Sequence, residues 1–212
     1  MMKKILTALC AMMITVGASA QMMSGGFRLD NRSVYYGLRM GFTSSHIAGD
    51  LDTDAKTGLN LGAVFGLRCS PYIPMFLESG VYYTEKGGKM SLGHDDSTYK
   101  YNLSYIEMPL LMKYGVEVAD QFAVLPYVGP TFGFGVAGQT KEKFPGGVRK
   151  YDSFGDDKFN RFDVGIKLGC GIEWNMLYAE LGYQWGITNI GDFPSDDEAY
   201  NRHFFMNIGI NF

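Results

Sequence analysis

The chain has 212 residues, a length that suits one domain, and a formal net charge of −3 at pH 7. A mildly acidic chain without a basic run offers nucleic acid no electrostatic footprint, so we expect no nucleic-acid partner. The sequence contains 28 glycines, 15 phenylalanines and 14 tyrosines with only 19% charged residues. This composition favours many strands with tight packing around them.

The N-terminus has the features of a cleavable secretory signal. Lys3 and Lys4 precede an apolar run, which is followed by the small-residue tripeptide ASA. We therefore expect a cleaved signal peptide over 1–20 and a short periplasmic segment over 21–33. No later apolar stretch approaches the roughly 18 to 20 residues of a spanning helix, so any membrane span must be made of strands.

Eight segments of alternating apolar and small or polar residues follow the signal. In the sixth segment, FDVGIKLGCGIEW, every odd position is apolar or aromatic and every even position is glycine or charged. Such faces fit a strand with lipid on one side and a narrow polar lumen on the other. In chain order the predicted strands cover 34–43, 59–70, 75–86, 103–116, 122–137, 162–174, 177–187 and 203–212.

The connections between these strands alternate between short and long. Three are short, at 71–74, 117–121 and 175–176, and four are long, at 44–58, 87–102, 138–160 and 188–202. This order is typical of a meander with short periplasmic turns and long external loops. Since backbone amides in hydrocarbon must be paired, the strands should close. We predict an all-β fold, an eight-stranded antiparallel up-and-down transmembrane β-barrel over 34–212 with four longer external loops.

A secreted soluble β-sandwich is the rival fold. The predicted strands reach ten residues or more, whereas globular strands average about 5 to 6 and a bilayer requires about 9 to 11. Aromatic residues also gather near strand ends, as in interfacial girdles: Phe162, Trp174, Tyr183, Trp185, Phe204 and Phe212. These features favour the membrane barrel.

The last strand is apolar at every second position up to a terminal phenylalanine. The residues are Phe204, Met206, Ile208, Ile210 and Phe212. This pattern resembles the signal by which outer-membrane barrels are recognised for assembly. We expect outer-membrane lipid and the barrel-assembly machinery as partners.

Four motifs carry a family resemblance over most of the mature chain: YIEMPLLMKYGV at Tyr105–Val116, YYTEKGGK, PYVGPTFGFG and ELGYQWGITNIG. They resemble the PorT-like outer-membrane β-barrel domain family. The resemblance implies an eight-stranded barrel in the outer membrane of a diderm bacterium. Most members have no known activity and some are linked to protein secretion. Ile210 stands where barrel-end signals often have an aromatic residue.

Charged residues are expected inside the barrel. Nine fall on inward faces: Arg39, Arg68, Glu78, Glu107, Lys113, Asp163, Lys167, Glu173 and Glu180. An eight-stranded barrel is just wide enough for its own side chains to fill. Since buried charges need partners, the near balance of four bases and five acids favours a structural plug over an open pore. A turn centred near Ile73 would pair Arg68 with Glu78.

Three further patterns favour ordinary structural explanations. GFGVAG fits a dinucleotide-binding spacing, but no βαβ unit surrounds it, so we interpret its glycines as small lumen residues. Asp50, Asp52 and Asp54 have calcium-like spacing without the glycine and the bidentate acid of a calcium loop. They are a weak metal candidate, and we expect no metal or cofactor.

Ser45, His46 and His203 could meet at the external rim, where some outer-membrane barrels carry hydrolase sites. No acid is placed to orient a histidine, so we expect no enzymatic activity. Cys69 and Cys170 face lipid on strands across the ring, and we expect no disulfide between them.

The sequence therefore predicts a structural or interaction barrel that presents external loops, with a small-solute pore, a secretion-associated barrel and a rim hydrolase as alternatives. A protein or glycan partner would bind at the loops. The loops carry aromatic residues among aspartates and lysines: Tyr99, Tyr101, Phe144, Tyr151 and Phe154.

Overall fold

The structure is a computed structural model of the whole chain, and it describes residues 33–92, 97–155, 158–192 and 197–212. The expected signal peptide over 1–20 and almost all of the expected periplasmic segment over 21–33 lie outside these residues. The described residues include no helix that is long and apolar enough to cross a membrane.

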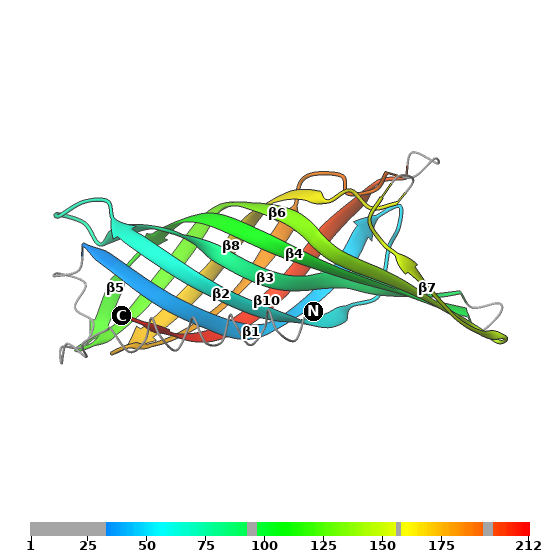
Figure 1. Cartoon of the computed structure of the whole chain (residues 1–212). Coiled ribbons are helices and arrows are strands. Elements are labelled where there is room, and N and C mark those ends of the chain that lie inside the picture. The colour runs from blue at the N-terminus through cyan, green and yellow to red at the C-terminus, as the bar shows by residue number, and fades with distance from the viewer. Residues whose placement is uncertain (1–32, 93–96, 156–157, 193–196) are drawn as a thin grey trace.

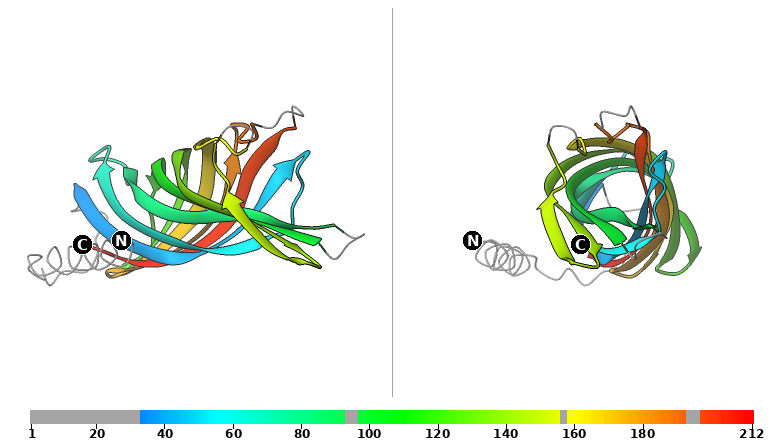
Figure 2. Two further views of the ribbon diagram at one scale, coloured as in Figure 1. Left: turned by 45° about the vertical axis from the view of Figure 1, so that its right-hand side comes forward. Right: turned by 90° about the vertical axis from the view of Figure 1, so that its right-hand side faces the viewer.

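Ten strands form one continuous sheet. They are β1 (Val34–Gly49), β2 (Lys56–Arg68), β3 (Met75–Leu92), β4 (Ser97–Tyr114), β5 (Val116–Ala119), β6 (Phe122–Phe144), β7 (Gly147–Asp152), β8 (Phe162–Trp174), β9 (Leu177–Gly186) and β10 (Ala199–Asn211). Strand β10 pairs with β1, and β4 pairs with β6, so the sheet closes on itself (Figures 1 and 2). The prediction of an eight-stranded antiparallel meander is confirmed, with β5 and β7 as additions at the edge of β6.

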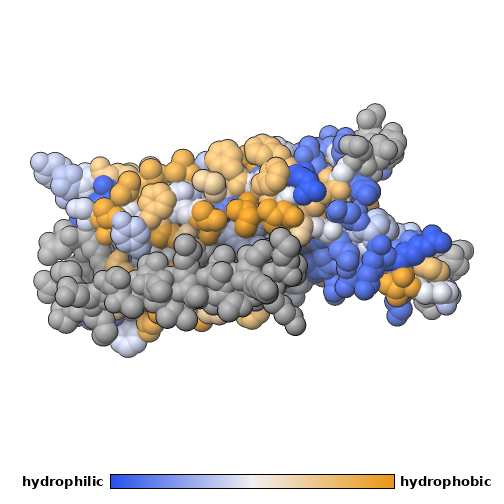
Figure 3. Space-filling model, viewed as in Figure 1, coloured by the Kyte–Doolittle hydropathy of each residue, from blue (hydrophilic) through white to orange (hydrophobic). Residues whose placement is uncertain are grey.

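Side chains alternate between the outside and the inside of this ring. On β8, Phe162, Ile166 and Trp174 are exposed outward, while the charged and glycine positions between the outward residues face inward. The 13 residues of β8 extend about 40 Å, or about 30 Å in height at a typical barrel tilt, which matches a bilayer core. Large apolar side chains are exposed on the outward faces of the ring strands, and on the visible face they gather in a broad band (Figure 3).

The short connections lie at one end of the barrel together with the C-terminus (Figure 1). The turn between β8 and β9 uses Asn175 at a φ of 60°, a left-handed conformation that asparagine tolerates. In the turn between β2 and β3, Arg68 pairs with Phe76 and Glu78 pairs with Gly66. The turn is therefore centred at Tyr72, not at Ile73, and Arg68 is not directly opposite Glu78 as predicted.

The long connections are only partly loops. Strand β3 continues to Leu92, β4 begins at Ser97, and β6 continues to Phe144 before β7 returns. These strands form a four-stranded sheet that projects beyond the ring, which we call the extension (Figures 1 and 2). The prediction that 87–102 and 138–160 are loops was therefore wrong in part. Strand β10 also begins earlier than predicted, at Ala199.

Pro109 lies on an inward position in the middle of β4. The pairing of β3 with β4 is interrupted between the pairs Ser79–Leu110 and Tyr82–Glu107, because proline has no backbone N–H to give to the ladder, while the register stays the same on both sides. The Ser79 hydroxyl donates to the Pro109 carbonyl oxygen at 2.8 Å and bridges the gap. Pro109 therefore lines the lumen as an uncharged residue of β4.

Candidate functional site

The interior of the barrel is the candidate site. Eight of the nine predicted lumen charges are buried and face inward: Arg39, Glu78, Glu107, Lys113, Asp163, Lys167, Glu173 and Glu180. Arg68 also occupies an inward position, over the Phe76 ring, but it is only half-buried, and its guanidinium Nε donates to the Ser70 carbonyl oxygen at 2.8 Å and closes the β2–β3 turn.

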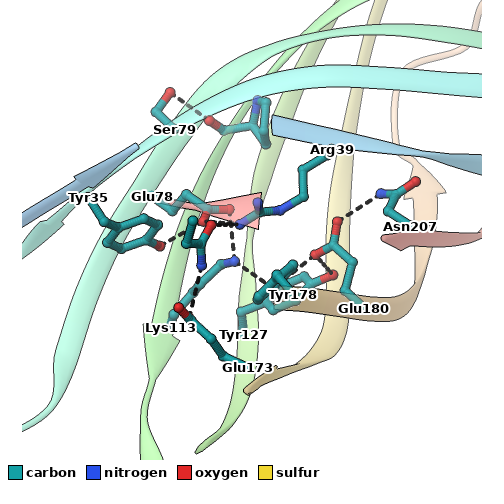
Figure 4. Close-up of polar contacts among 12 residues, drawn as sticks. Tyr35, Arg39, Glu78, Ser79, Lys113, Tyr127, Glu173, Tyr178, Glu180 and Asn207 are labelled. Carbon is teal, nitrogen blue, oxygen red and sulfur yellow. Dashed lines mark hydrogen bonds and ion pairs between the residues drawn. The ribbon is translucent and has the colours of Figure 1, made fainter. Parts of the chain in front are cut away.

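Glu78 is the centre of the cluster nearer the short turns (Figure 4). The Tyr35 hydroxyl donates to Glu78 Oε2 at 2.6 Å. Lys113 Nζ lies 2.8 Å from Glu78 Oε1, and Arg39 Nη2 lies 3.7 Å from Glu78 Oε2. The side chains of all three charged residues are 0% exposed, so one carboxylate is shared by two buried cations.

The two cations of this cluster have further partners. Arg39 stacks over the Tyr178 ring at 3.8 Å, and its Nη2 donates to Asn211 Oδ1 at 2.6 Å. The Asn211 amide donates in turn to Glu173 Oε2 at 2.9 Å. Lys113 Nζ donates to the Tyr178 hydroxyl at 2.8 Å. The planar guanidinium thus uses both its face and its edge, which a lysine could not reproduce.

Glu180 accepts three hydrogen bonds from neutral groups. The hydroxyls of Tyr127 and Tyr178 donate to Oε2 at 2.8 Å and 3.1 Å, and the Asn207 amide donates to Oε1 at 2.8 Å (Figure 4). A carboxylate with this number of donors can stay charged although it is buried.

A second ionic cluster lies closer to the external end. Lys86 Nζ lies 2.5 Å from Glu107 Oε1 and 2.9 Å from Asp163 Oδ2. Glu107 also accepts from the Thr84 hydroxyl and the Gln184 amide, each at 3.0 Å. Here one buried cation is shared by two carboxylates, the reverse of the arrangement around Glu78.

Two asparagines connect the clusters. The Thr84 hydroxyl donates to Asn60 Oδ1 at 2.9 Å, and the Asn60 amide donates to Asn207 Oδ1 at 3.0 Å. The single Thr84 hydroxyl proton is shared between Asn60 Oδ1 and Glu107 Oε2, and the Asn207 amide donates to Glu180, so these polar groups link the two clusters. Polar side chains therefore fill the lumen over most of its length.

Sequence reasoning missed Lys86 and the neutral members of this network. The inward positions of β3 run Glu78, Tyr82, Thr84 and Lys86 at a period of two, so extending the alternation to the predicted strand end would have found the lysine. The asparagines and tyrosines gave no such signal, because uncharged polar residues also occur on water-facing strands.

Lys167 is held differently from the other cations. Its Nζ lies 5.0 Å from the Tyr82 ring centre and 4.6 Å from the Phe205 ring centre. Cation–π contact of this kind is strongest where water is excluded. Lys167 therefore fills the lumen between the two ionic clusters and rests on aromatic faces.

Both mouths of the barrel are lined by apolar clusters. Near the short turns the cluster contains Tyr35, Phe76, Ala123, Leu125 and Tyr178. At the external mouth it contains Ile47, Leu103, Tyr105, Phe154, Phe159, Ile190 and Ala199. The polar network is thus enclosed by an apolar layer at each end.

Phe154 comes from the connection after β7 and folds into the external mouth. It packs edge-on against Tyr105 at 5.7 Å between ring centres and is only 3% exposed, so it does not serve as an exposed loop aromatic as expected. A Cβ at Gly135 would collide with Phe154 Cζ. Gly138 of the same motif also lies against this ring, so two of the GFGVAG glycines make room for it by lacking a side chain.

The predicted rim set does not form a catalytic arrangement. Ser45 and His203 are paired in register and buried, whereas His46 is on the opposite face of β1. The Ser45 hydroxyl donates to the carbonyl oxygens of Lys56 and Gly87, not to His203. Neither ring nitrogen of His203 has a hydrogen-bond partner in the part of the chain that the structure describes.

The weak metal candidate is not assembled either. Asp50 Oδ2 accepts from the Glu198 backbone N–H at 2.9 Å, and Asp54 forms a backbone bridge with Lys89. Over the described ranges, no three His, Cys, Asp or Glu side chains come together as metal ligands. Cys69 and Cys170 are free.

The alternating apolar residues at the C-terminus lie on the outer surface, whereas the predicted loop aromatics are divided between the surface of the extension and the external mouth. The five C-terminal residues of the alternating pattern, Phe204 to Phe212, are exposed on the lipid-facing side of β10. On the extension, the Tyr99 hydroxyl donates to Glu142 at 2.8 Å, and this hydrogen bond raises the pKa of Tyr99. Burial raises the pKa of Tyr101 to about 12.

Comparison with known proteins supports this architecture. The family model of the outer membrane protein beta-barrel domain matches residues 19–192. The crystal structure of Neisserial surface protein A (NspA) matches with a TM-score of 0.51 at 14% identity, covering 85% of this chain and 98% of that chain. At such identity the likeness concerns the fold alone. No curated protein matches the sequence.

Two further solved structures show a weaker likeness. A major outer membrane protein from Thermus thermophilus matches with a TM-score of 0.46 at 12% identity, over 84% of this chain and 99% of that chain. The attachment invasion locus protein Ail of Yersinia pestis matches with a TM-score of 0.41 at 12% identity, over 85% of this chain and all of that chain.

Proposed function

The chain belongs to the outer membrane protein beta-barrel domain family, and from this premise we propose that it is a closed barrel of structural and interaction type. In this proposal the lumen does not conduct solutes. The extension and the external connections present the surface that a protein or glycan partner would contact.

The observation that supports a closed lumen best is the continuous network between two apolar mouths. Glu78 with Lys113, and Lys86 with Glu107, are ion pairs whose side chains are at most 1% exposed. An open aqueous pore would leave such groups in contact with water. Eight-stranded barrels have an interior that side chains can fill, which agrees with this packing.

Planar-bilayer recording of the folded full-length protein tests the proposal. Samples that show the mobility difference between boiled and unboiled protein on a denaturing gel establish that the barrel is folded. We expect no stable conductance from such samples, while a general porin inserted by the same procedure conducts. Reproducible channel steps from the wild-type barrel would establish the small-solute pore in its place.

A non-enzymatic role is part of the same proposal. It is supported by the separation of His46 from Ser45 and by the bonding of the Ser45 hydroxyl to backbone carbonyls. We expect no hydrolysis of phospholipid or peptide substrates above the level of a Ser45→Ala and His203→Ala double variant. Activity that the double variant loses would identify a hydrolase.

We also propose that the chain is a PorT-like barrel from a diderm bacterium and that it takes part in protein secretion. This proposal rests on the motif Tyr105–Val116, in which Glu107 and Lys113 belong to the lumen network and Pro109 to the wall. Deleting the gene in the source organism and comparing the secreted proteins tests the link. An unchanged secreted fraction would remove it.

A further inference from the structure

Four lysines face one another across the extension. Lys89 on β3 is opposite Lys100 on β4, Lys100 is opposite Lys141 on β6, and Lys141 is opposite Lys150 on β7. Directly opposed residues share a face of the sheet, and like charges in such positions destabilise it. Lys143 adds a fifth lysine on the same face, two residues beyond Lys141. The stability of the sheet does not explain this lysine row.

The acidic residues near the lysine row form no ion pair with it in the described part of the chain. Across the described residues, none of its five ammonium groups forms an ion pair. Asp152 accepts a hydrogen bond from the Phe154 backbone, and Glu142 is on the other face with Tyr99. Asp54 is directly opposite Lys89 and shares the face at this end of the row, and Glu85 is four residues before Lys89 on the same face, where it accepts from the Leu59 backbone N–H. The face therefore keeps a clear excess of positive charge.

Protection of sheet edges does not account for the row. Lysine on an edge strand prevents unwanted pairing, and this reason suits Lys150 on β7. Lys100 and Lys141, however, are on β4 and β6, which are paired on both sides within the extension. Their positions call for a partner outside the chain.

The lysine row is on the outward face of the wall. The outward positions of β4 include Ile106 and Ser104, and the same alternation leads to Lys100. On β6 the register shift places Ala137 opposite Ser104, so Lys141 keeps the outward direction. Hydrophilic residues gather where the extension leaves the apolar band (Figure 3). The row thus continues the surface that faces lipid.

The height of the row above the apolar band fits a headgroup layer. Lys89 is six residues beyond outward-facing Tyr83 on β3, which is about 20 Å along the strand and about 14 Å in height at a tilt near 45°. A lysine stem of about 6 Å can extend back towards the membrane. The Lys89 ammonium then comes within about 8 Å of the level of Tyr83, at the outer edge of the polar layer, which adds about 5 to 7 Å on each side of the hydrocarbon.

We propose that the lysine row binds the phosphate groups of anionic lipid headgroups in the outer leaflet. Basic clusters next to a membrane-facing surface attract such lipids, and each lysine near the surface strengthens binding roughly fivefold. This role goes beyond the closed-barrel function and does not depend on whether the lumen conducts.

Native mass spectrometry of the folded protein in neutral detergent, titrated with the bisphosphorylated glycolipid lipid A, tests the proposal. We expect the Lys100→Gln and Lys141→Gln double variant to bind the lipid about thirtyfold more weakly than wild type. The matched control is Arg149→Gln with Lys158→Gln, which removes two charges away from the row and should change affinity less than about twofold. If the first double variant does not fold, Lys89→Gln with Lys150→Gln makes the same test.

Two results would overturn the inference. Equal lipid A affinity for the row variant and wild type would show that these lysines do not contact the headgroup. Inorganic phosphate that binds wild type as tightly as lipid A does would indicate a site for free phosphate and not for a lipid. A loss of wild-type binding at high salt that the row variant does not share would support direct phosphate contact.

Discussion

Glu78 is expected to contribute strongly to the stability of the barrel. Its carboxylate is shared by Lys113 and Arg39 and is fully buried, so the change Glu78→Gln leaves two cations with uncompensated charge. Breaking a buried ion pair in this way costs about 3 to 5 kcal/mol. We expect the free energy of unfolding in denaturant to fall by that amount. The matched change Asp120→Asn in an exposed turn should cost less than about 0.5 kcal/mol.

A double-mutant cycle identifies the partner of Glu78. Residues in contact show coupling of about 0.5 to 3 kcal/mol, whereas distant residues are additive. We expect coupling between Glu78→Gln and Lys113→Met, and additivity between Glu78→Gln and Arg68→Met, because Arg68 bonds to the Ser70 carbonyl. Coupling to Arg68 in place of Lys113 would restore the pairing that the sequence predicted.

Gly135 and Phe154 form a second testable pair at the external mouth. A Cβ at residue 135 would collide with Phe154 Cζ, so Gly135→Ala must displace the ring. We expect a loss of about 1 to 3 kcal/mol in unfolding free energy, as for other overpacked sites. In a Phe154→Ala background the same glycine change should cost much less. An equal cost in both backgrounds would mean that the ring is not the obstacle.

At the scale of elements, alternation predicted the ring strands well but not the extension. The outward positions of β8 are apolar and the inward ones polar, so hydropathy reports the period of two. In the extension one face carries lysines and the other carries tyrosines and Glu142, so both faces are polar or amphipathic. The backbone period persists there, but the hydropathy contrast that reveals it is gone.

The β6–β7 hairpin should be dispensable for the barrel. Thr140 and Tyr151 are directly opposed, so residues 141–150 can be replaced by a two-residue Asn-Gly turn. Phe154 and the lumen network lie outside the deleted part, and we therefore expect the gel mobility shift of the folded barrel to persist. A loss of that shift would show that the hairpin belongs to the cooperative unit of the barrel.

At the scale of the whole molecule, the lumen contacts could not be read from the sequence. Arg39 on β1 meets Glu78 on β3, and Lys86 on β3 meets Asp163 on β8. Such partners depend on the tilt and curvature of the closed ring, which alternation along single strands does not encode. The one local rule that was available, pairing across a hairpin, placed Arg68 beside Glu78 although the turn is centred one residue earlier.

The closed-lumen proposal leads us to expect two barriers to solutes in series. The external aromatic cluster and the ionic network consist of different buried residues, so removing one leaves the other in place. We expect no conductance in planar bilayers from Phe154→Ala with Phe159→Ala, and none from Lys86→Ala with Glu107→Ala. The four changes together should give measurable channel steps in protein that keeps its gel mobility shift. Conductance from the mouth variant alone would show that the ionic network does not block the lumen, whereas silence of the fourfold variant would place the main barrier at the cluster of Tyr35, Phe76 and Tyr178 near the short turns.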